Sequence, residues 1–304
     1  MPNGLIMKAL SGYYYVRPDD ASGNELVQCR ARGVFKIKGV TPLVGDRVVY
    51  TVTENGEGTV AEIFPRRSEL IRPPIANPDF ALLVFSTREP DLNLTLLDKF
   101  LVHVEKAGLE AAICFTKLDL AIKSEDFRTT AGMTVREARE CYERIGYDTF
   151  LVCARDGTGI PDLYAKLQNR MTVVAGQSGV GKSSLLNALI TDLRLETAPI
   201  SMKLGRGKHT TRHVELIGLP HGGMIADTPG FSQLDFADIA PDELTQYFRE
   251  FAQYADSCKY RGCLHVSEPG CQVRRAKESG GIAPHRYENY RIFLEELKAK
   301  KRRC

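Results

Sequence analysis

A glycine-rich stretch near the middle of the chain constrains its fold more than any other segment. Residues 176–183 read Gly-Gln-Ser-Gly-Val-Gly-Lys-Ser, a full match to the pattern GxxxxGK[ST]. The apolar run Met171–Ala175 before it predicts a strand, and Ser184–Ile190 after it has helical spacing. In this order the glycines let backbone N–H groups surround a phosphate at a helix N-terminus. The alternative is a glycine-rich turn between a strand and a helix, but the full match favours a nucleotide-binding P-loop.

Each position of the loop has an expected role. Lys182 is predicted to bridge the β- and γ-phosphates and to assist catalysis, and the Ser183 hydroxyl to ligate Mg²⁺. The predicted nucleotide contacts in this segment are Gly176, Gln177, Ser178, Gly179, Val180, Gly181, Lys182, Ser183 and Ser184.

A second motif indicates which base is bound. Thr116-Lys117-Leu118-Asp119 follows Glu110–Phe115, which has the pattern of a buried strand. The Asp119 carboxylate is suited to accept hydrogen bonds from the N1–H and 2-amino groups of guanine, which adenine does not offer. An ordinary strand-end turn is the alternative, but α/β sheets bind ligands at this end of a strand. The motif therefore favours GTP or GDP over ATP, with contacts from Thr116, Lys117, Leu118 and Asp119.

A third motif is expected near the γ-phosphate and its metal. Asp227-Thr-Pro-Gly230 follows the short apolar run Gly222–Ala226, about fifty residues beyond the P-loop. Asp227 is predicted to hold Mg²⁺ through water, and the Gly230 N–H to contact the γ-phosphate. In the polar stretch Gly205–Arg212, Thr211 (or failing that Thr210) is predicted to complete the Mg²⁺ shell, although both threonines are equally compatible with a solvent-facing loop.

The residue after Gly230 bears on catalysis. Ras-like enzymes place a glutamine there to orient the attacking water, whereas this chain has Phe231, which offers no hydrogen bond. Slow intrinsic hydrolysis is therefore expected, and His209 is the predicted catalytic group that positions the water. The alternative for His209 is a loop histidine that contacts an RNA phosphate.

The order of the motifs is itself informative. The guanine motif precedes the P-loop by about sixty residues, whereas in ordinary GTPases it comes last. Leu151-Val-Cys-Ala154 also precedes it and resembles the short loop that contacts guanine O6, with Cys153 and the Ala154 N–H at the base. The chain is therefore predicted to contain a circularly permuted G domain.

A cluster of metal-ligating residue types follows. Cys258, Cys263, His265 and Cys271 fall within fourteen residues and fit a closed, structural Zn²⁺ site. Iron–sulfur ligation and disulfides are the alternatives. Because Met1–Lys8 lack the apolar core of a signal peptide, a cytoplasmic location is expected and disulfides are disfavoured.

Charge and β-patterning indicate an RNA partner. From Lys259 to Cys304 there are 12 Lys and Arg against 5 Asp and Glu, and no apolar run approaches the length of a membrane span. The first 67 residues hold about five short strand patterns separated by turn signals, as in a small OB-type barrel. Within it, Phe35 lies among Arg30, Arg32, Lys36 and Lys38, which is compatible with an RNA-binding face or with a solvated loop.

Together these features resemble the bacterial ribosome-small-subunit-dependent GTPases, the RsgA/YjeQ/EngC family, over nearly the whole chain. The landmarks are Val44–Val48, Gly176–Ser184, Gly207–Thr211, Asp227–Phe231 and Cys258–Cys271. The resemblance implies an OB-fold domain (1–67), a central α/β permuted GTPase (68–233) and a mostly helical zinc domain with a basic tail (234–304). Thr116 departs from the usual asparagine, which weakens the expected contact with base N7, and Cys153 stands where serine is common.

The resemblance also implies an activity. We expect a monomeric, cytoplasmic GTP hydrolase with Mg²⁺ and one structural Zn²⁺. It is expected to bind the small ribosomal subunit and its rRNA, to act late in the maturation of that subunit and to be stimulated by it, with no membrane partner. The alternative is an rRNA-binding assembly scaffold whose nucleotide is mainly structural, although Lys182, Ser183 and Asp227 together favour hydrolysis.

Overall fold

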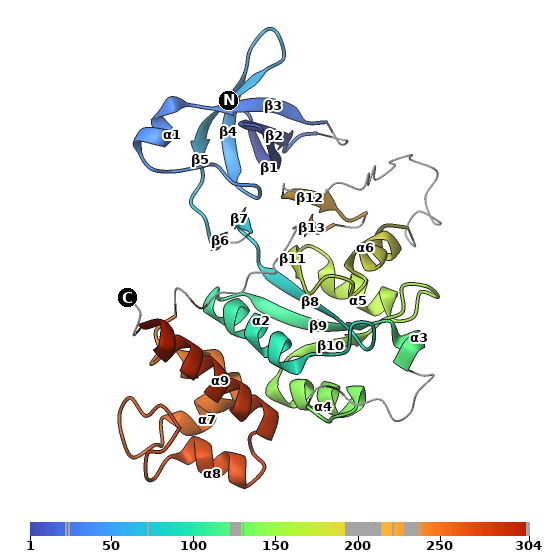
Figure 1. Cartoon of the computed structure of the whole chain (residues 1–304). Helices are drawn as coiled ribbons and strands as arrows, with labels where there is room; N and C mark the ends of the chain where they lie inside the picture. The colour runs from blue at the N-terminus through green and yellow to red at the C-terminus, as the bar shows by residue number, and fades with distance from the viewer. Residues whose placement is uncertain are drawn as a thin grey trace. The chain divides into compact units, whose positions relative to one another are not determined.

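The computed structural model describes residues 1–21, 23, 25–71, 73–121, 129, 131–191, 214–220, 222–227, 236 and 239–301 (Figure 1). The chain divides into two compact units, and each is described by itself. Unit 1 comprises Met1–Leu82, Ile160–Ala175 and Ser183–Phe231, and unit 2 comprises Leu83–Gly159, Gly176–Lys182 and Ser232–Cys304. The domain boundaries expected after residues 67 and 233 stay predictions.

Unit 1 begins with a closed five-stranded barrel. Its strands are β1 (Asn3–Leu10), β2 (Tyr13–Pro18), β3 (Val27–Ala31), β4 (Arg47–Val52) and β5 (Gly58–Ile63). They pair in the order β1-β2-β3-β5-β4, and β4 pairs back onto β1, so the barrel is closed. Inward side chains such as Ile6, Val16, Val48 and Val60 are fully buried. This arrangement confirms the predicted OB-type barrel.

A short helix, α1 (Gly33–Ile37), follows β3. Its Phe35 is buried, with only 8% of its surface exposed. The ring therefore packs in the interior of unit 1, whereas Arg30, Arg32 and Lys38 around it are exposed, and their RNA-binding role stays a prediction.

The Val44–Val48 landmark is held by a buried ion pair. Asp46 is wholly buried and accepts hydrogen bonds from Arg66 Nε (2.8 Å) and Nη2 (2.7 Å). Gly45 has φ +90°, and a Cβ there would lie 2.0 Å from the Ala76 carbonyl oxygen, so only glycine fits. The close approach of Gly45 to Ala76 joins the barrel to the hairpin formed by β6 (Glu69–Ile71) and β7 (Pro74–Ala76).

Unit 1 also holds one part of the α/β domain. Its elements are α5 (Ile160–Leu167), β11 (Met171–Ala175), most of α6 (Lys182–Thr191), β12 (Glu215–Gly218) and β13 (Met224–Asp227). Strand β11 pairs with β13 in parallel, and β12 pairs with β13 in antiparallel orientation. The strand predicted before Gly176 is therefore β11.

Unit 2 contains the remainder of that domain. Strand β8 (Phe80–Ser86) continues from unit 1 into unit 2 and is buried throughout. It is followed by α2 (Leu94–Lys106), β9 (Glu110–Thr116), α3 (Leu118–Ala121), α4 (Val135–Ile145) and β10 (Asp148–Leu151). Strands β9 and β10 pair in parallel, so the loops after them emerge at the same edge.

The C-terminal elements of unit 2 are helical. They are the 3₁₀ helices η2 (Leu244–Tyr247) and η3 (Arg249–Phe251), then α7 (Ala252–Ala255), α8 (Gln272–Glu278) and α9 (Pro284–Lys301). Their apolar side chains form one cluster that includes Phe248, Phe251, Tyr290 and Phe293, and Val102 of α2 belongs to it. The C-terminal helices therefore share a core with α2.

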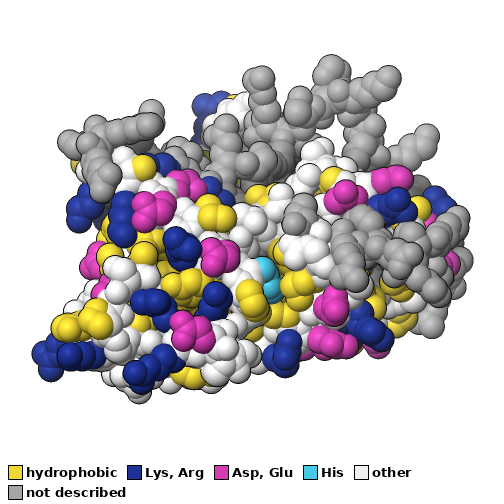
Figure 2. Space-filling model, turned by 60° about the horizontal axis from the view of Figure 1, so that its bottom comes forward, with side chains coloured by type: hydrophobic (Ala, Val, Ile, Leu, Met, Phe, Trp, Pro, Cys, Tyr) yellow, Lys and Arg dark blue, Asp and Glu magenta, His cyan; other side chains and the backbone are white. Residues whose placement is uncertain are grey.

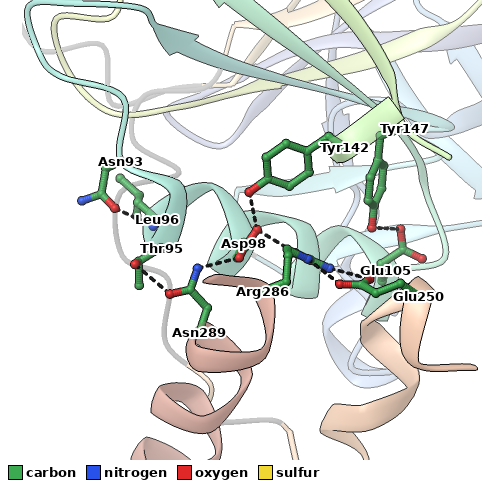
Figure 3. A network of polar contacts seen from close by, with 10 residues as sticks. All are labelled: Asn93, Thr95, Leu96, Asp98, Glu105, Tyr142, Tyr147, Glu250, Arg286 and Asn289. Carbon is green, nitrogen blue, oxygen red and sulfur yellow. Dashed lines mark hydrogen bonds and ion pairs between the residues drawn. The ribbon is translucent and has the colours of Figure 1, made fainter. Parts of the chain in front are cut away.

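A buried polar network reinforces this packing (Figure 3). Asp98 of α2 accepts hydrogen bonds from Arg286 (2.6 Å), Asn289 (2.6 Å) and the Tyr142 hydroxyl (2.6 Å). Arg286 also donates to both carboxylate oxygens of Glu250, at 2.7 and 2.9 Å. Because these charges are paired and hydrogen-bonded, their burial between α2, α4, η3 and α9 is tolerated.

Two further expectations can be compared with the fold. Cys29, Cys114, Cys141 and Cys153 lie outside the metal cluster and are buried, as cysteines that pack in a core would be. In the described part of the chain, no helix has both the length and the apolar character needed to cross a membrane.

Candidate nucleotide and metal sites

The glycine-rich loop adopts a conformation that glycine makes possible. It leaves β11 at Gly176, where φ is +149° and a Cβ would lie 2.1 Å from the Val84 carbonyl oxygen. Gly179 and Gly181 also have positive φ, at +82° and +92°. The loop then enters α6 at Lys182. This strand–loop–helix order has the geometry in which P-loops bind phosphate.

The Lys182 side chain is folded over this loop. Its ammonium donates to the carbonyl oxygens of Gly176 (2.6 Å) and Gln177 (2.7 Å). The positive charge of Lys182 therefore lies over the glycine-rich turn. A bound anion would replace the two backbone carbonyls as the partner of this ammonium. Ser183 and Ser184 follow in the first turn of α6 and are exposed.

The predicted base motif lies against the P-loop within unit 2. Thr116 ends β9 and is 3% exposed, and its hydroxyl donates to the Val180 carbonyl (2.5 Å). Lys117 has φ +57°, and its carbonyl accepts from the Thr87 hydroxyl (2.9 Å). A Cβ on Gly181 would lie about 4 Å from both Thr116 and Lys117. Two segments far apart in sequence are thereby brought together.

The Asp119 carboxylate faces the loop that follows β10. Its Oδ1 lies 3.7 Å from the Cys153 thiol, and its Oδ2 lies 3.3 Å from the Arg155 guanidinium. Leu118 N–H donates to the Val152 carbonyl (3.4 Å), which joins the two loops through their backbones. Leu118 and Asp119 therefore lie against the loop of Val152, Cys153 and Arg155, in which Ala154 stands between the last two. The contact of Arg155 with Asp119 was not predicted from the sequence. The position of Arg155 directly after Ala154 was the signal that could have indicated it.

The predicted magnesium and switch residues are only partly described. Asp227 ends β13, which runs parallel to β11 with Ala226 opposite Val173. The predictions for His209, Thr210, Thr211 and Gly230 lie outside the described residues, as does the Asp227 side chain.

The cysteine–histidine cluster does come together. The ligating atoms of Cys258, Cys263, His265 and Cys271 all lie within 4.8 Å of one another. His265 Nδ1 lies 3.7 Å from Cys258 Sγ and 3.4 Å from Cys271 Sγ. A tetrahedral Zn²⁺ with usual bond lengths separates nitrogen and sulfur by about 3.6 Å. The donor set and its spacing therefore fit one tetrahedral metal ion.

The surroundings of the cluster stabilise the ligands. The backbone N–H groups of Gln272 and Arg274 point at Cys258 Sγ (3.3 Å) and Cys271 Sγ (3.4 Å), as expected around thiolates. The Tyr287 and Tyr290 hydroxyls donate to the carbonyls of His265 (2.7 Å) and Leu264 (3.0 Å). These bonds fix the ligand loop to α9.

Glu268 belongs to the same loop and stabilises it through hydrogen bonds with the loop backbone. Burial alone would raise the pKa of this carboxyl. The backbone N–H groups of Leu264, Val266 and Ser267 donate to it at 2.8 to 3.0 Å and outweigh burial, so that the pKa falls to about 2.

Comparisons with known proteins agree with this geometry. The family model described as RsgA GTPase matches residues 63–237, and that of the RsgA N-terminal domain matches residues 3–60. Proteins named small ribosomal subunit biogenesis GTPase RsgA are 52% identical in Geobacillus thermodenitrificans and 49% identical in Bacillus subtilis, each over 303 residues and 100% of both chains.

Solved structures show the same relationship. The crystal structure of YloQ, described as a circularly permuted GTPase, superposes with a TM-score of 0.81 at 43% identity, covering 99% of this chain and 96% of the other. YjeQ from Thermotoga maritima gives 0.81 at 35% identity, with 97% and 98% covered. The permuted order inferred from the motifs is thus confirmed. The chain belongs to the RsgA GTPase family.

Proposed function

We propose that this protein hydrolyses GTP to GDP and phosphate and acts in the biogenesis of the small ribosomal subunit. The observation that carries the nucleotide part is the hydrogen bond from Thr116 to the Val180 carbonyl, because it holds the base motif against the P-loop. The ribosomal part rests on the names of relatives that align over the whole chain.

The nucleotide contacts follow from this arrangement. Asp119 would pair with guanine N1–H and the 2-amino group, and the Ala154 N–H with O6. Arg155 would have to release the Asp119 carboxylate as the base enters, because it now lies 3.3 Å from Oδ2. The Lys182 ammonium would exchange the Gly176 and Gln177 carbonyls for the β- and γ-phosphates.

The hydrolytic roles are proposed from the sequence. Ser183, Thr211 and Asp227 would complete the Mg²⁺ shell, and the Gly230 N–H would contact the γ-phosphate. Since Phe231 provides no hydrogen bond to water, His209 would position the nucleophile once the subunit has bound. The hydroxyls and carboxylate of this set are the oxygen donors that Mg²⁺ prefers.

The metal of the Cys258–Cys271 cluster would be one structural Zn²⁺. Three sulfurs and one imidazole nitrogen form a closed tetrahedral set without a position for substrate. Its role would be to shape the C-terminal surface, where basic residues outnumber acidic ones. We propose that this surface contacts rRNA, and that the protein works as a cytoplasmic monomer.

A hydrolysis assay tests the proposal. GTP turnover should be slow alone and rise strongly with isolated small subunits, and large subunits provide the control. Lys182→Ala should abolish turnover in both conditions, whereas His209→Ala should bind GTP normally and lose most of the stimulated rate. Equal turnover with and without small subunits would contradict the ribosomal role, and ATP turnover as fast as GTP turnover would contradict the guanine role.

A further inference from the structure

One short loop of the C-terminal domain is not used by the nucleotide or metal sites. Residues 259–262, which read Lys-Tyr-Arg-Gly, lie between the cluster cysteines Cys258 and Cys263. The Lys259 side chain packs over Gly270, where a Cβ would lie 3.1 Å from the Lys259 Cβ. Both ends of the 259–262 loop are therefore fixed by the metal cluster, and its base rests on the turn before α8.

This fixed loop exposes an aromatic ring. Tyr260 has 45% of its surface exposed, and among the aromatic side chains that the structure describes only Phe64, at 37%, is also exposed. An apolar ring held in solvent loses the stabilisation that burial gives to the other aromatic side chains. A binding partner that covers the Tyr260 ring would explain why this ring is exposed on a loop that is fixed at both ends.

Positive charge surrounds the ring. The Lys259 ammonium lies 5.4 Å from the Tyr260 ring centroid, and both Lys259 and Arg261 are exposed. Within the described residues neither cation takes part in an ion pair, whereas the acidic Glu268 of the adjoining loop is occupied by backbone N–H groups. In Figure 2, Lys and Arg side chains gather on the left, the side on which Figure 1 places α7, α8 and α9.

We propose that the 259–262 loop binds an unpaired RNA base, which stacks on Tyr260 while Lys259 and Arg261 contact the flanking phosphates. Every base offers a π-face to an aromatic ring, and the cations suit a polyanion rather than an apolar protein surface. In a duplex those faces are hidden by neighbouring base pairs, so unpaired RNA is the fitting partner. The proposal rests on the proposed ribosomal function and specifies its point of contact.

The composition of the chain permits a direct test. It contains no tryptophan, so Tyr260→Trp introduces the sole indole at the proposed contact. Ile292→Trp is the matched control, because Ile292 is 54% exposed on α9 of the same domain. Both full-length variants are titrated with a single-stranded oligoadenylate, with an RNA duplex of equal length and with isolated small subunits. Zinc content is measured in each variant.

We expect the emission of Tyr260→Trp to be quenched by the single strand and by the small subunit, and the duplex and the Ile292→Trp protein to give little change. Tyr260→Ala should weaken single-strand binding about tenfold, the size of one lost base stack. Tyr260→Phe should bind as the wild type, because the ring remains. Lys259→Gln and Arg261→Gln should each reduce the salt dependence of binding.

Equal quenching at both positions, or wild-type affinity in zinc-loaded Tyr260→Ala, would overturn the proposal. If Tyr260→Ala fails to fold, Tyr260→Trp and Tyr260→Phe still decide it. Failure of the ribosomal function would be seen separately, as GTP turnover in the wild type that small subunits do not stimulate. Stimulated turnover together with an unquenched Tyr260→Trp would refute the base-stacking contact alone.

Discussion

Arg286 of α9 and Asp98 of α2 lie 2.6 Å apart, and neither side chain is exposed to solvent. Glu250 is a second carboxylate partner, at 2.7 Å from Arg286 Nε. The pair joins the C-terminal elements, which carry the cysteine–histidine cluster, to a helix of the α/β domain. Since a lone buried charge is costly, removal of Arg286 would leave two buried carboxylates without their cationic partner.

The first prediction concerns this pair. Arg286→Ala should lower the free energy of unfolding by about 3–5 kcal/mol, because two buried carboxylates lose their partner. Urea titration at saturating zinc measures it. Arg291→Ala, on the same helix but in an exposed pair with Glu288 at 3.3 Å, should change stability little. A loss of equal size in both variants would show that the buried charge is not what stabilises this contact.

A second prediction concerns pH. Burial lowers the pKa of His285, and Asp98 and Glu250 only partly oppose this. The folded protein therefore binds this proton less readily than the unfolded chain, which takes it up below about pH 6.5. Wild-type stability should fall from pH 7 to 5 more steeply than that of His285→Gln. A constant difference across this range, with zinc in excess for both proteins, would contradict the assignment.

A third prediction concerns Thr116. Thr116→Val removes the donor to the buried Val180 carbonyl and should weaken GDP and GTP binding together, by about 1–3 kcal/mol if the carbonyl stays unpaired. Thr116→Ser restores a hydroxyl and should bind nearly as the wild type. Titration with a fluorescent GDP analogue measures both variants. Equal binding by Val and Ser variants would mean that the hydroxyl does not hold the two loops together.

Base choice gives a fourth prediction. Asp119→Asn should shift preference from GTP toward XTP, because an amide donor suits the 2-oxo group of xanthine. Arg155→Ala is the matched control: it removes the 3.3 Å partner of Asp119 but should leave the preference for guanine intact. Competition binding with GTP and XTP measures it, and an unchanged ratio in Asp119→Asn would remove Asp119 from the base site.

Metal loss gives a fifth prediction. Cys263→Ser should lose one zinc equivalent and loosen the segment from Cys258 to Cys271, because metal coordination supplies much of its stability. Helix α9 should stay on α2, since Arg286 and Asn289 of α9 hydrogen-bond to Asp98 of α2. Hydrogen exchange with elemental analysis tests this, and Cys29→Ala is the zinc-retaining control. Nucleotide binding by Cys263→Ser should be unchanged. If the wild-type protein, purified without chelators, carries iron and sulfide, the assignment of zinc to the cluster is refuted.

The sequence by itself determined the parts of this protein that are local. The P-loop from Gly176 to Ser183 sets its own backbone through glycines, and alternation of apolar residues identifies the barrel strands. The spacing of Cys258, Cys263, His265 and Cys271 likewise identified a metal site, because a short loop limits how far its ligands separate. Motif order alone was enough to infer the circular permutation.

Only the tertiary structure decided which side chains are buried and what they contact. Arg286 was counted in the basic surface, yet it is fully buried against Asp98, 188 residues away. Phe35 looked like part of an RNA face and is buried, whereas Tyr260 is exposed. The Thr116 hydroxyl bonds to Val180, 64 residues away. Such partners depend on how distant elements pack, and local composition and periodicity contain no information about that.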